Sequence, residues 1–386
     1  MAGVGGFSTR CIHAGEAPDP TTGAHGVPLY QNVTFAFETN SQVEAMRSGD
    51  RPHFTYSPRG NPTVRCLELK IADLEGTEAS VAMSSGMAAI SSVLLTLLAG
   101  VGHLLASDQL YDLTKDFLHE DVAALGSSVT FLDLSDADAI QDAITPRTRA
   151  IYVESFSNPL LRVADIRALA RLAHENDVVL VVDNTFLSPA LLRPAALGAD
   201  IVLHSATKYL SGNGQVQGGV VSGPRQLIDP IRSRALRLGA AMSPFAAWLL
   251  LSGIHTLPLR MERHSENASR LAEFLAAHAA VADVHYPGLS SDPGHALAAS
   301  LLGPGELHCG GMIAFTLSGG REAVGPFLDA LKLCTIAVSL GDSSTLVWPW
   351  PCGNLIRMSI GLEDPVDLQA DLVQALNAVI PAAAVG

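Results

Sequence analysis

Short apolar runs alternate with amphipathic stretches between about residue 76 and residue 225 of this chain. The runs lack the polar alternation of a strand that has one face in water, so they predict strands buried on both faces. The stretches between them, such as Gly86–Leu98 and Ile166–Asn176, are predicted helices. The predicted strands are His103–Ser107, Ala150–Glu154, Val178–Asp183, Ile201–His204 and Gly219–Ser222. Strands separated by helices predict an α/β domain whose sheet is mostly parallel and covered on both faces.

The segments on either side of this region have different patterns. Residues 1–60 show little periodicity, which predicts an extended arm laid over another surface. Asn61 and Pro62 then suit the start of a helix, and Gly76 suits its end. The C-terminal third predicts a second, smaller α/β domain from the following elements: a long helix from Pro244 to about Ala277, strands near Met312–Thr316 and Leu355–Ile360, and a closing helix Val366–Val379. The expected parts are an arm (1–60), a large domain (61–257) and a C-terminal domain (258–386).

Composition narrows the functional class. Hydrophobic residues make up 48% of the 386 residues, yet no apolar run approaches the ~18–20 residues of a membrane helix. The net charge of −14 and the absence of a basic stripe argue against nucleic-acid binding. The start has neither the charged nor the apolar region of a secretory signal. The cysteines form no CxxC pair, which argues against a metal site or a disulfide framework: Cys11, Cys66, Cys309, Cys334 and Cys352. We therefore expect a cytoplasmic protein without a metal.

Polar groups gather where an open parallel sheet binds its ligands, at the carboxyl ends of the predicted strands. Ser84–Ala89 starts a predicted helix, where free N–H groups favour a phosphate, although a plain N-cap has the same appearance. Asp183 ends a strand and either caps a loop or faces a cationic cofactor nitrogen. Lys208, one of only four lysines, is either a solvated loop residue or an amine that binds a cofactor covalently. Asn158 follows another strand and can reach the same place.

At these residues the chain resembles the cystathionine γ-synthase/γ-lyase family of pyridoxal 5′-phosphate (PLP) enzymes, also called the Cys/Met-metabolism family. The resemblance runs almost end to end. It is carried by IHAGEAPDPTTGA (12–24), NPTV (61–64), SSGMAAI (84–90), VESFSNP (153–159), VVDNTF (181–186), HSATKYLSG (204–212), GGVV (218–221), AVSLGD (337–342) and IRMSIGLED (356–364). It implies the aspartate-aminotransferase-like fold (fold type I), a bound PLP and a small amino-acid substrate.

The resemblance also implies a role for each matching residue. Lys208 corresponds to the Schiff-base lysine, Asp183 to the partner of the pyridinium nitrogen, and Tyr111 to the tyrosine that stacks on the ring and acts as acid or base. The remaining cofactor contacts would come from Ser85, Gly86, Met87, Asn158, Ser205, Thr207, Tyr56 and Arg59. Substrate contacts would come from Arg357, Ser339 and Asn158. Tyr56 would be donated by a neighbouring subunit, which implies a homodimer with shared sites, usually doubled into a tetramer.

The chain departs from the family pattern at three places. The arginine of the Tyr-x-Arg motif is displaced by Pro58 to Arg59. Asp112 replaces the glycine that usually follows the tyrosine, and Leu113 replaces the cysteine typical of methionine γ-lyases. Asp112 is either a solvated acid or a partner for a cationic or polar distal group of the substrate. A shortened loop with two tryptophans, Trp348 and Trp350, either reshapes the substrate entrance or forms a hydrophobic plug, and Cys352 in it is expected to be a bystander.

These motifs predict γ-elimination, which gives a 2-oxo acid and ammonia, on a methionine-, cystathionine- or homoserine-type amino acid. The AVSLGD segment most resembles the γ-lyases. γ-Replacement, as in cystathionine γ-synthase or O-acylhomoserine sulfhydrylase, uses the same groups and stays open as an alternative. A PLP-binding protein without turnover is a more remote alternative.

Overall fold

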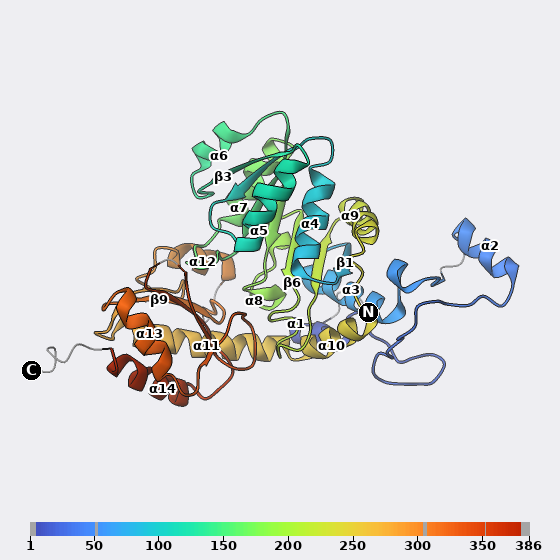
Figure 1. Ribbon diagram of the computed structural model, residues 1–386. Helices are drawn as coiled ribbons and strands as arrows, with labels where there is room; N and C mark the ends of the chain where they lie inside the picture. The colour runs from blue at the N-terminus through green and yellow to red at the C-terminus, as the bar shows by residue number, and fades with distance from the viewer. Residues whose placement is uncertain (1–4, 51–52, 304–306, 352, 380–386) are drawn as a thin grey trace, which may run out of the picture.

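The computed structural model describes residues 5–50, 53–303, 307–351 and 353–379, so Cys352 lies outside the described residues. Two sheets organise these residues, one of seven strands and one of five. Figure 1 shows the seven-stranded sheet in the upper part of the molecule and the C-terminal sheet with its red helices at the left. None of the described helices combines the length and the apolar character needed to cross a membrane.

The seven-stranded sheet is mostly parallel, as predicted. Only β7 runs against its neighbours. The strands in spatial order are β1 (Ala79–Met83), β7 (Gly219–Gly223), β6 (Ile201–Ser205), β5 (Val179–Asp183), β4 (Thr148–Glu154), β2 (His103–Ser107) and β3 (Ser128–Leu132). The five strands predicted from the sequence are all present. The two that were not predicted, β1 and β3, are the edges of the sheet, and β3 is partly exposed and therefore lacks a continuous apolar run.

Helices cover both faces of this sheet and form two apolar layers. Val181 and Leu203 pack towards α4 and α9, whereas Leu180 and Val202 pack on the other face towards α3 and α7. The helical segments are α3 (Pro62–Glu75), α4 (Gly86–Leu97), α5 (Asp112–Asp116), η2 (Phe117–Val122), α6 (Ala137–Ala143), α7 (Ile166–Glu175), α8 (Ser188–Leu191), η3 (Pro194–Leu197), α9 (Arg225–Arg237) and α10 (Pro244–His255). Helix α3 begins and ends as predicted, because the Asn61 side chain accepts from the Thr63 N–H at 2.9 Å and Gly76 adopts φ +75°.

The C-terminal part contains the five-stranded, mainly antiparallel sheet. Its order is β10 (Thr335–Ile336), β11 (Leu346–Pro349), β12 (Leu355–Ser359), β9 (Met312–Leu317) and β8 (Val281–His285). Its helices are α11 (Leu257–Ala276), α12 (His295–Leu302), α13 (Arg321–Ala330) and α14 (Pro365–Asn377). We propose the domain boundaries expected from the sequence, 61–257 and 258–386, since the change from one sheet to the other falls across α11.

The single long helix predicted from Pro244 to about Ala277 was wrong. The structure has two helices, α10 and α11, separated at Thr256, whose φ and ψ are −103° and 5°. Pro258 lies in the first turn of α11, where its missing N–H is tolerated, whereas inside a continuous helix it would remove a backbone hydrogen bond. The apolar periodicity runs across the break and therefore gave no sign of it.

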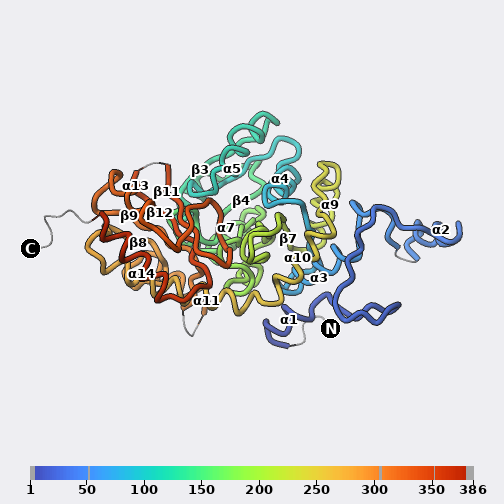
Figure 2. Tube along the Cα trace, turned by 60° about the horizontal axis from the view of Figure 1, so that its bottom comes forward, coloured from blue at the N-terminus to red at the C-terminus, as the bar shows by residue number. Residues whose placement is uncertain are grey.

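The N-terminal arm is more structured than the sequence indicates. It contains α1 (Phe7–His13), α2 (Asn40–Ser48) and the short turn η1 (Ser57–Arg59). Helix α1 packs against α3 and α10, and its Cys11 is fully buried. The segment with α2, by contrast, stands away from both sheets in Figures 1 and 2.

A buried lysine attaches α1 to the large domain. The side chain of Lys70, on α3, is fully buried; its Nζ lies 2.9 Å from Glu16 Oε1 and donates to the carbonyl oxygens of Cys11 and Ile12 at 2.5 and 3.1 Å. Glu16 also contacts His255 Nε2 at 2.7 Å. Burial lowers the pKa of Lys70, while Glu16 opposes that shift. Because three acceptors surround one ammonium, we infer that this group holds α1 in place.

We predict that Lys70→Met destabilises the protein by about 3 kcal/mol, because it leaves the carbonyls of Cys11 and Ile12 without this donor and removes the ammonium beside Glu16. The thermal midpoint should fall by several degrees, measured by calorimetry. Lys332→Met, at an exposed position, is the matched control and should leave the midpoint unchanged. An equal midpoint for the two variants would contradict the proposed role of Lys70.

Candidate active site

A cavity of about 430 Å³ opens at the carboxyl ends of β4, β5 and β6, where the C-terminal domain approaches the large domain. The structure brings eleven of the thirteen predicted site residues to its wall: Ser85, Gly86, Met87, Tyr111, Asn158, Asp183, Ser205, Thr207, Lys208, Ser339 and Arg357. The C-terminal domain supplies Ser339 and Arg357, so neither domain forms the cavity alone. Within the described ranges, no cluster of three or more His, Cys, Asp or Glu side chains could hold a metal ion.

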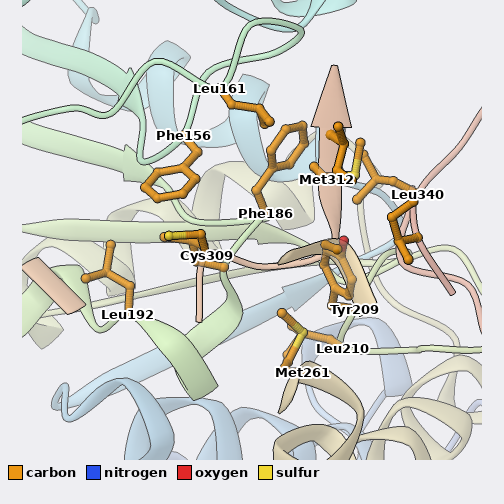
Figure 3. Close-up of a cluster of buried hydrophobic side chains, with 14 of the residues drawn as sticks. Phe156, Leu161, Phe186, Leu192, Tyr209, Leu210, Met261, Cys309, Met312 and Leu340 are labelled. Carbon is orange, nitrogen blue, oxygen red and sulfur yellow. The ribbon is translucent and has the colours of Figure 1, made fainter. Parts of the chain in front are cut away.

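One apolar core joins the two domains beside this cavity. Figure 3 shows Tyr209, which follows Lys208, together with Met261 of α11, Met312 of β9 and Leu340 of the C-terminal domain. These side chains belong to a single buried cluster. The positions of Lys208 and of the loop at Ser339 are therefore set by the same packing.

The amine of Lys208 is mostly buried and unusually easy to deprotonate. Its Nζ donates to Ser339 Oγ at 2.9 Å. Burial, reinforced by the positive charge of Arg357, lowers the pKa of Lys208 to about 8. Gly341 lets the Ser339 loop approach: it has φ +75°, and a Cβ there would lie 2.7 Å from the Tyr209 nitrogen. A neutral amine is the form that attacks an aldehyde, so this environment suits covalent attachment of a carbonyl cofactor.

Asp183 is a buried acid with no ion-pair partner among the described residues. Burial raises its pKa, whereas the N–H and hydroxyl of Thr185, which donate at 2.9 and 2.5 Å, lower it. Tyr152 donates to its other oxygen at 3.4 Å. A carboxylate held in this way would be ionised by a cationic group bound in the cavity.

The start of α4 provides donors for an anion. Ser85 Oγ accepts from the Ala88 N–H at 3.0 Å and caps the helix, which leaves the N–H groups of Gly86 and Met87 without an acceptor in the helix. A Cβ on Gly86 would lie 2.9 Å from the Cβ of Ser205, so only glycine lets the helix start approach that side chain. The hydroxyl of Thr207 is held by the backbone of Gly218 at the same wall.

Arg357 is a buried cation without a carboxylate partner among the described residues; the residue is only 6% exposed. Its Nη1 donates to Asn158 Oδ1 at 2.8 Å and its Nη2 to the Ser339 carbonyl oxygen at 3.2 Å. Burial lowers its pKa from the usual value. Since a buried charge is costly unless it is paired, this guanidinium is a site for an anionic group.

The sequence did not indicate the role of Glu154. Its two carboxylate oxygens accept from the backbone N–H groups of Tyr111 at 2.8 Å and Asn158 at 3.1 Å, so it joins the two loops that carry these residues. Burial and the neighbouring Asp183 raise its pKa. The only sequence signal for Glu154 was its position, as an acid at the end of an apolar strand, which it shares with Asp183. The backbone groups that it binds can be identified only from the structure.

Tyr111 lies at the mouth of the cavity and is 43% exposed. Burial and the adjacent Asp112 raise the pKa of its phenol, which is therefore protonated at neutral pH. Asp112 also lines the cavity, whereas the half-exposed Leu113 does not.

The structure does not bring Tyr56 and Arg59 to the cavity of their own chain. Tyr56 is 47% exposed, and Arg59 lines a separate cavity of about 470 Å³ between the arm and α9. Pro58 lies inside the η1 turn that carries Arg59. Both side chains are exposed in the single chain.

The sequence profile of the Cys/Met metabolism PLP-dependent enzymes matches residues 8–352. This chain belongs to that family. It is 44% identical to L-methionine γ-lyase of Pseudomonas putida, over 97% of this chain and 98% of the relative. It is 41% identical to cystathionine γ-synthase of Mycobacterium bovis, with the same two shares.

Solved structures confirm the expected fold. The crystal structure of metB from Corynebacterium glutamicum matches with a TM-score of 0.92 and 37% identity, over 98% of this chain and 99% of the other. A putative O-acetylhomoserine (thiol)-lyase from Campylobacter jejuni, solved with a pyridoxyl-lysine group, matches with a TM-score of 0.91 and 31% identity, over 96% and 99%. The family cofactor fits this cavity, whose helix start, buried acid and low-pKa amine match a phosphate, a cationic ring nitrogen and an aldehyde.

We predict that PLP uptake by the cofactor-free protein depends on a group with a pKa near 8. The fraction of Lys208 in the neutral amine form increases as pH rises, and this is the form that reacts with PLP. The rate of uptake should therefore increase up to about pH 8 and then level off. Visible absorbance of the bound cofactor measures the rate. In Arg357→Met the curve should move to higher pH, because one cause of the lowered pKa is removed. A rate that keeps rising to pH 10 in the unmodified protein would contradict this assignment.

Proposed function

We propose that Lys208 binds PLP covalently and that the cofactor phosphate lies at the start of α4, near Ser205 and Thr207. Asp183 would face the ring nitrogen and Tyr111 the ring. When bound, PLP supplies an electron sink for carbanion chemistry at the substrate Cα. The lack of an ion-pair partner for Asp183 in the described chain supports this placement.

We further propose that the protein is a γ-lyase acting on a methionine-, cystathionine- or homoserine-type amino acid. The observation that carries this proposal is the arrangement around Ser339: its hydroxyl accepts from Lys208 at 2.9 Å, while its carbonyl accepts from Arg357 at 3.2 Å. A buried cation for a carboxylate thus lies next to an amine suited to moving protons. The substrate class that matches both groups is an α-amino acid.

The residues of this chain would divide the work as follows. Arg357 binds the substrate carboxylate and fixes the Cα–H bond near Lys208. Lys208 removes the Cα proton and then a Cβ proton, and after the leaving group departs it returns a proton to Cγ. Tyr111, protonated at neutral pH, donates its proton to the departing γ-heteroatom as the Cγ–heteroatom bond breaks. Water then completes the reaction, and the products are a 2-oxo acid, ammonia and the protonated leaving group.

γ-Replacement is the second candidate function, and it is supported by the 41% identity to cystathionine γ-synthase. In that reaction a thiol takes the place of the departing group at Cγ, and the amino group stays on the product. The 44% identity to L-methionine γ-lyase supports elimination. Both reactions remove protons from Cα and Cβ, and they differ in what then adds to Cγ: a proton in elimination, and a thiol in replacement.

We predict that the PLP-loaded protein releases 2-oxo acid and ammonia from methionine, cystathionine or homocysteine without an added thiol. The substrate panel also includes cysteine and O-acylhomoserines, each with and without a thiol nucleophile. Lys208→Ala is the control and should lower the rate about 10³-fold, since it removes the acid–base group. Product that forms only with the thiol would replace elimination with γ-replacement. Failure with every substrate despite bound PLP would favour a binding protein without turnover.

We predict that Tyr111→Phe slows elimination unequally for different leaving groups. A thiolate leaves poorly without a proton, so kcat on a thioether substrate should fall about 10²-fold. A carboxylate leaves without protonation, so kcat on an O-acylhomoserine should fall much less. Steady-state kinetics on both substrates measure the ratio. An equal loss on both would assign Tyr111 to another step.

We also propose a homodimer with shared active sites, doubled into a tetramer and located in the cytoplasm. The exposed Tyr56 and Arg59, outside the cavity of their own chain, support contributions from the arm to a neighbouring subunit. Light scattering and the activity of mixed Tyr56→Phe and Lys208→Ala subunits test this assembly. An active monomer would contradict it.

A further inference from the structure

The short hairpin of β11 and β12 carries two tryptophans on the same face as Arg357. Trp348 is paired directly with Arg357 in the antiparallel register. The backbone N–H of Trp350 donates to the Leu355 carbonyl oxygen at 2.8 Å, so the hydrogen-bonded pairing of the two strands continues beyond the end of β11. Residues opposite each other in such a ladder project to the same face, and so do residues two apart along one strand. Trp348 and Trp350 therefore both flank Arg357, and both line the cavity.

The guanidinium of Arg357 lies over the ring of Trp350. The Cζ atom lies 5.6 Å from the centroid of the Trp350 ring, within the range of a cation–π contact. The edges of the guanidinium are held separately, by Asn158 Oδ1 at 2.8 Å and the Ser339 carbonyl at 3.2 Å. Two hydrogen bonds alone leave the guanidinium some freedom to tilt, and the neighbouring Trp350 ring is the third contact that limits this freedom.

We propose that Trp350 is a positioning residue that holds the guanidinium plane of Arg357 for the carboxylate of an amino-acid substrate. The inference rests on the proposed function, because it takes Arg357 as the carboxylate-binding group. A planar guanidinium binds a carboxylate through two parallel hydrogen bonds, which depend on the orientation of that plane. Loss of the ring should therefore weaken carboxylate binding without affecting the cofactor.

The test uses L-norleucine, which has the shape of methionine but no heteroatom at Cγ and cannot undergo elimination. Its Kd for the PLP-loaded protein is measured from the change in visible absorbance. Trp350→Phe keeps a ring and should stay within about twofold of the original Kd. Trp350→Leu fills space without a π face, and both Trp350→Leu and Trp350→Ala should raise Kd about fivefold.

Two controls separate positioning from general packing. L-Norleucinamide lacks the carboxylate, so its Kd should be the same in all the Trp350 variants. In an Arg357→Lys background, Trp350→Leu should add little to the loss already caused by the lysine, because the planar partner is gone. The visible spectrum of the bound cofactor should not change in any Trp350 variant.

Equal Kd values for Trp350→Leu and Trp350→Phe would overturn the inference and leave Trp350 as a space-filling residue. So would a full additional loss in the Arg357→Lys background, or no binding of norleucine by the unmodified protein. The proposed function fails on a different measurement, the absence of turnover with every substrate of the panel. Norleucine binding with a ring-dependent Kd would support the role of Trp350 even then.

Discussion

The active site depends on charged groups that are buried without partners of opposite charge in the described chain. Arg357 and Asp183 are each held by backbone groups or neutral side chains. Burying a charge in this way is unfavourable for folding, and the unfavourable term is offset when ligands of complementary charge bind. The cavity is therefore complementary to a molecule with a cationic ring and to a substrate with a carboxylate.

Two domains are needed to produce this arrangement. The large domain places Asp183, Glu154 and the start of α4 at the carboxyl ends of its parallel strands, and Lys208 follows the last of them. The C-terminal domain adds Arg357 from β12 of its own sheet and Ser339 from a loop between β10 and β11. The buried cluster of Figure 3, which includes Tyr209, joins the two, so that the proton-transferring and carboxylate-binding groups stay in register.

The differences between sequence and structure have physical causes. Strand β3 was not predicted because it is partly exposed and has no continuous apolar run. Strand β1 is fully buried, but its five residues, ASVAM, are too short and too weakly apolar to stand out in the sequence. The break at Thr256 was not predicted because α10 and α11 both bury apolar residues, and periodicity reports burial rather than continuity of hydrogen bonds. The role of Glu154 was not predicted because its partners, the N–H groups of Tyr111 and Asn158, belong to backbone that carries no side-chain signal.

The sequence by itself determined the class of fold, the family and which chemical groups the site contains. The apolar runs specify buried strands, and the motifs specify Lys208, Asp183 and Arg357. Only the tertiary structure decided how these groups act on one another. Ser339 lies between Lys208 and Arg357, and Trp350 lies against the guanidinium of Arg357. These contacts join residues far apart in the chain or on paired strands, and their geometry follows from packing and strand register, which no local pattern specifies.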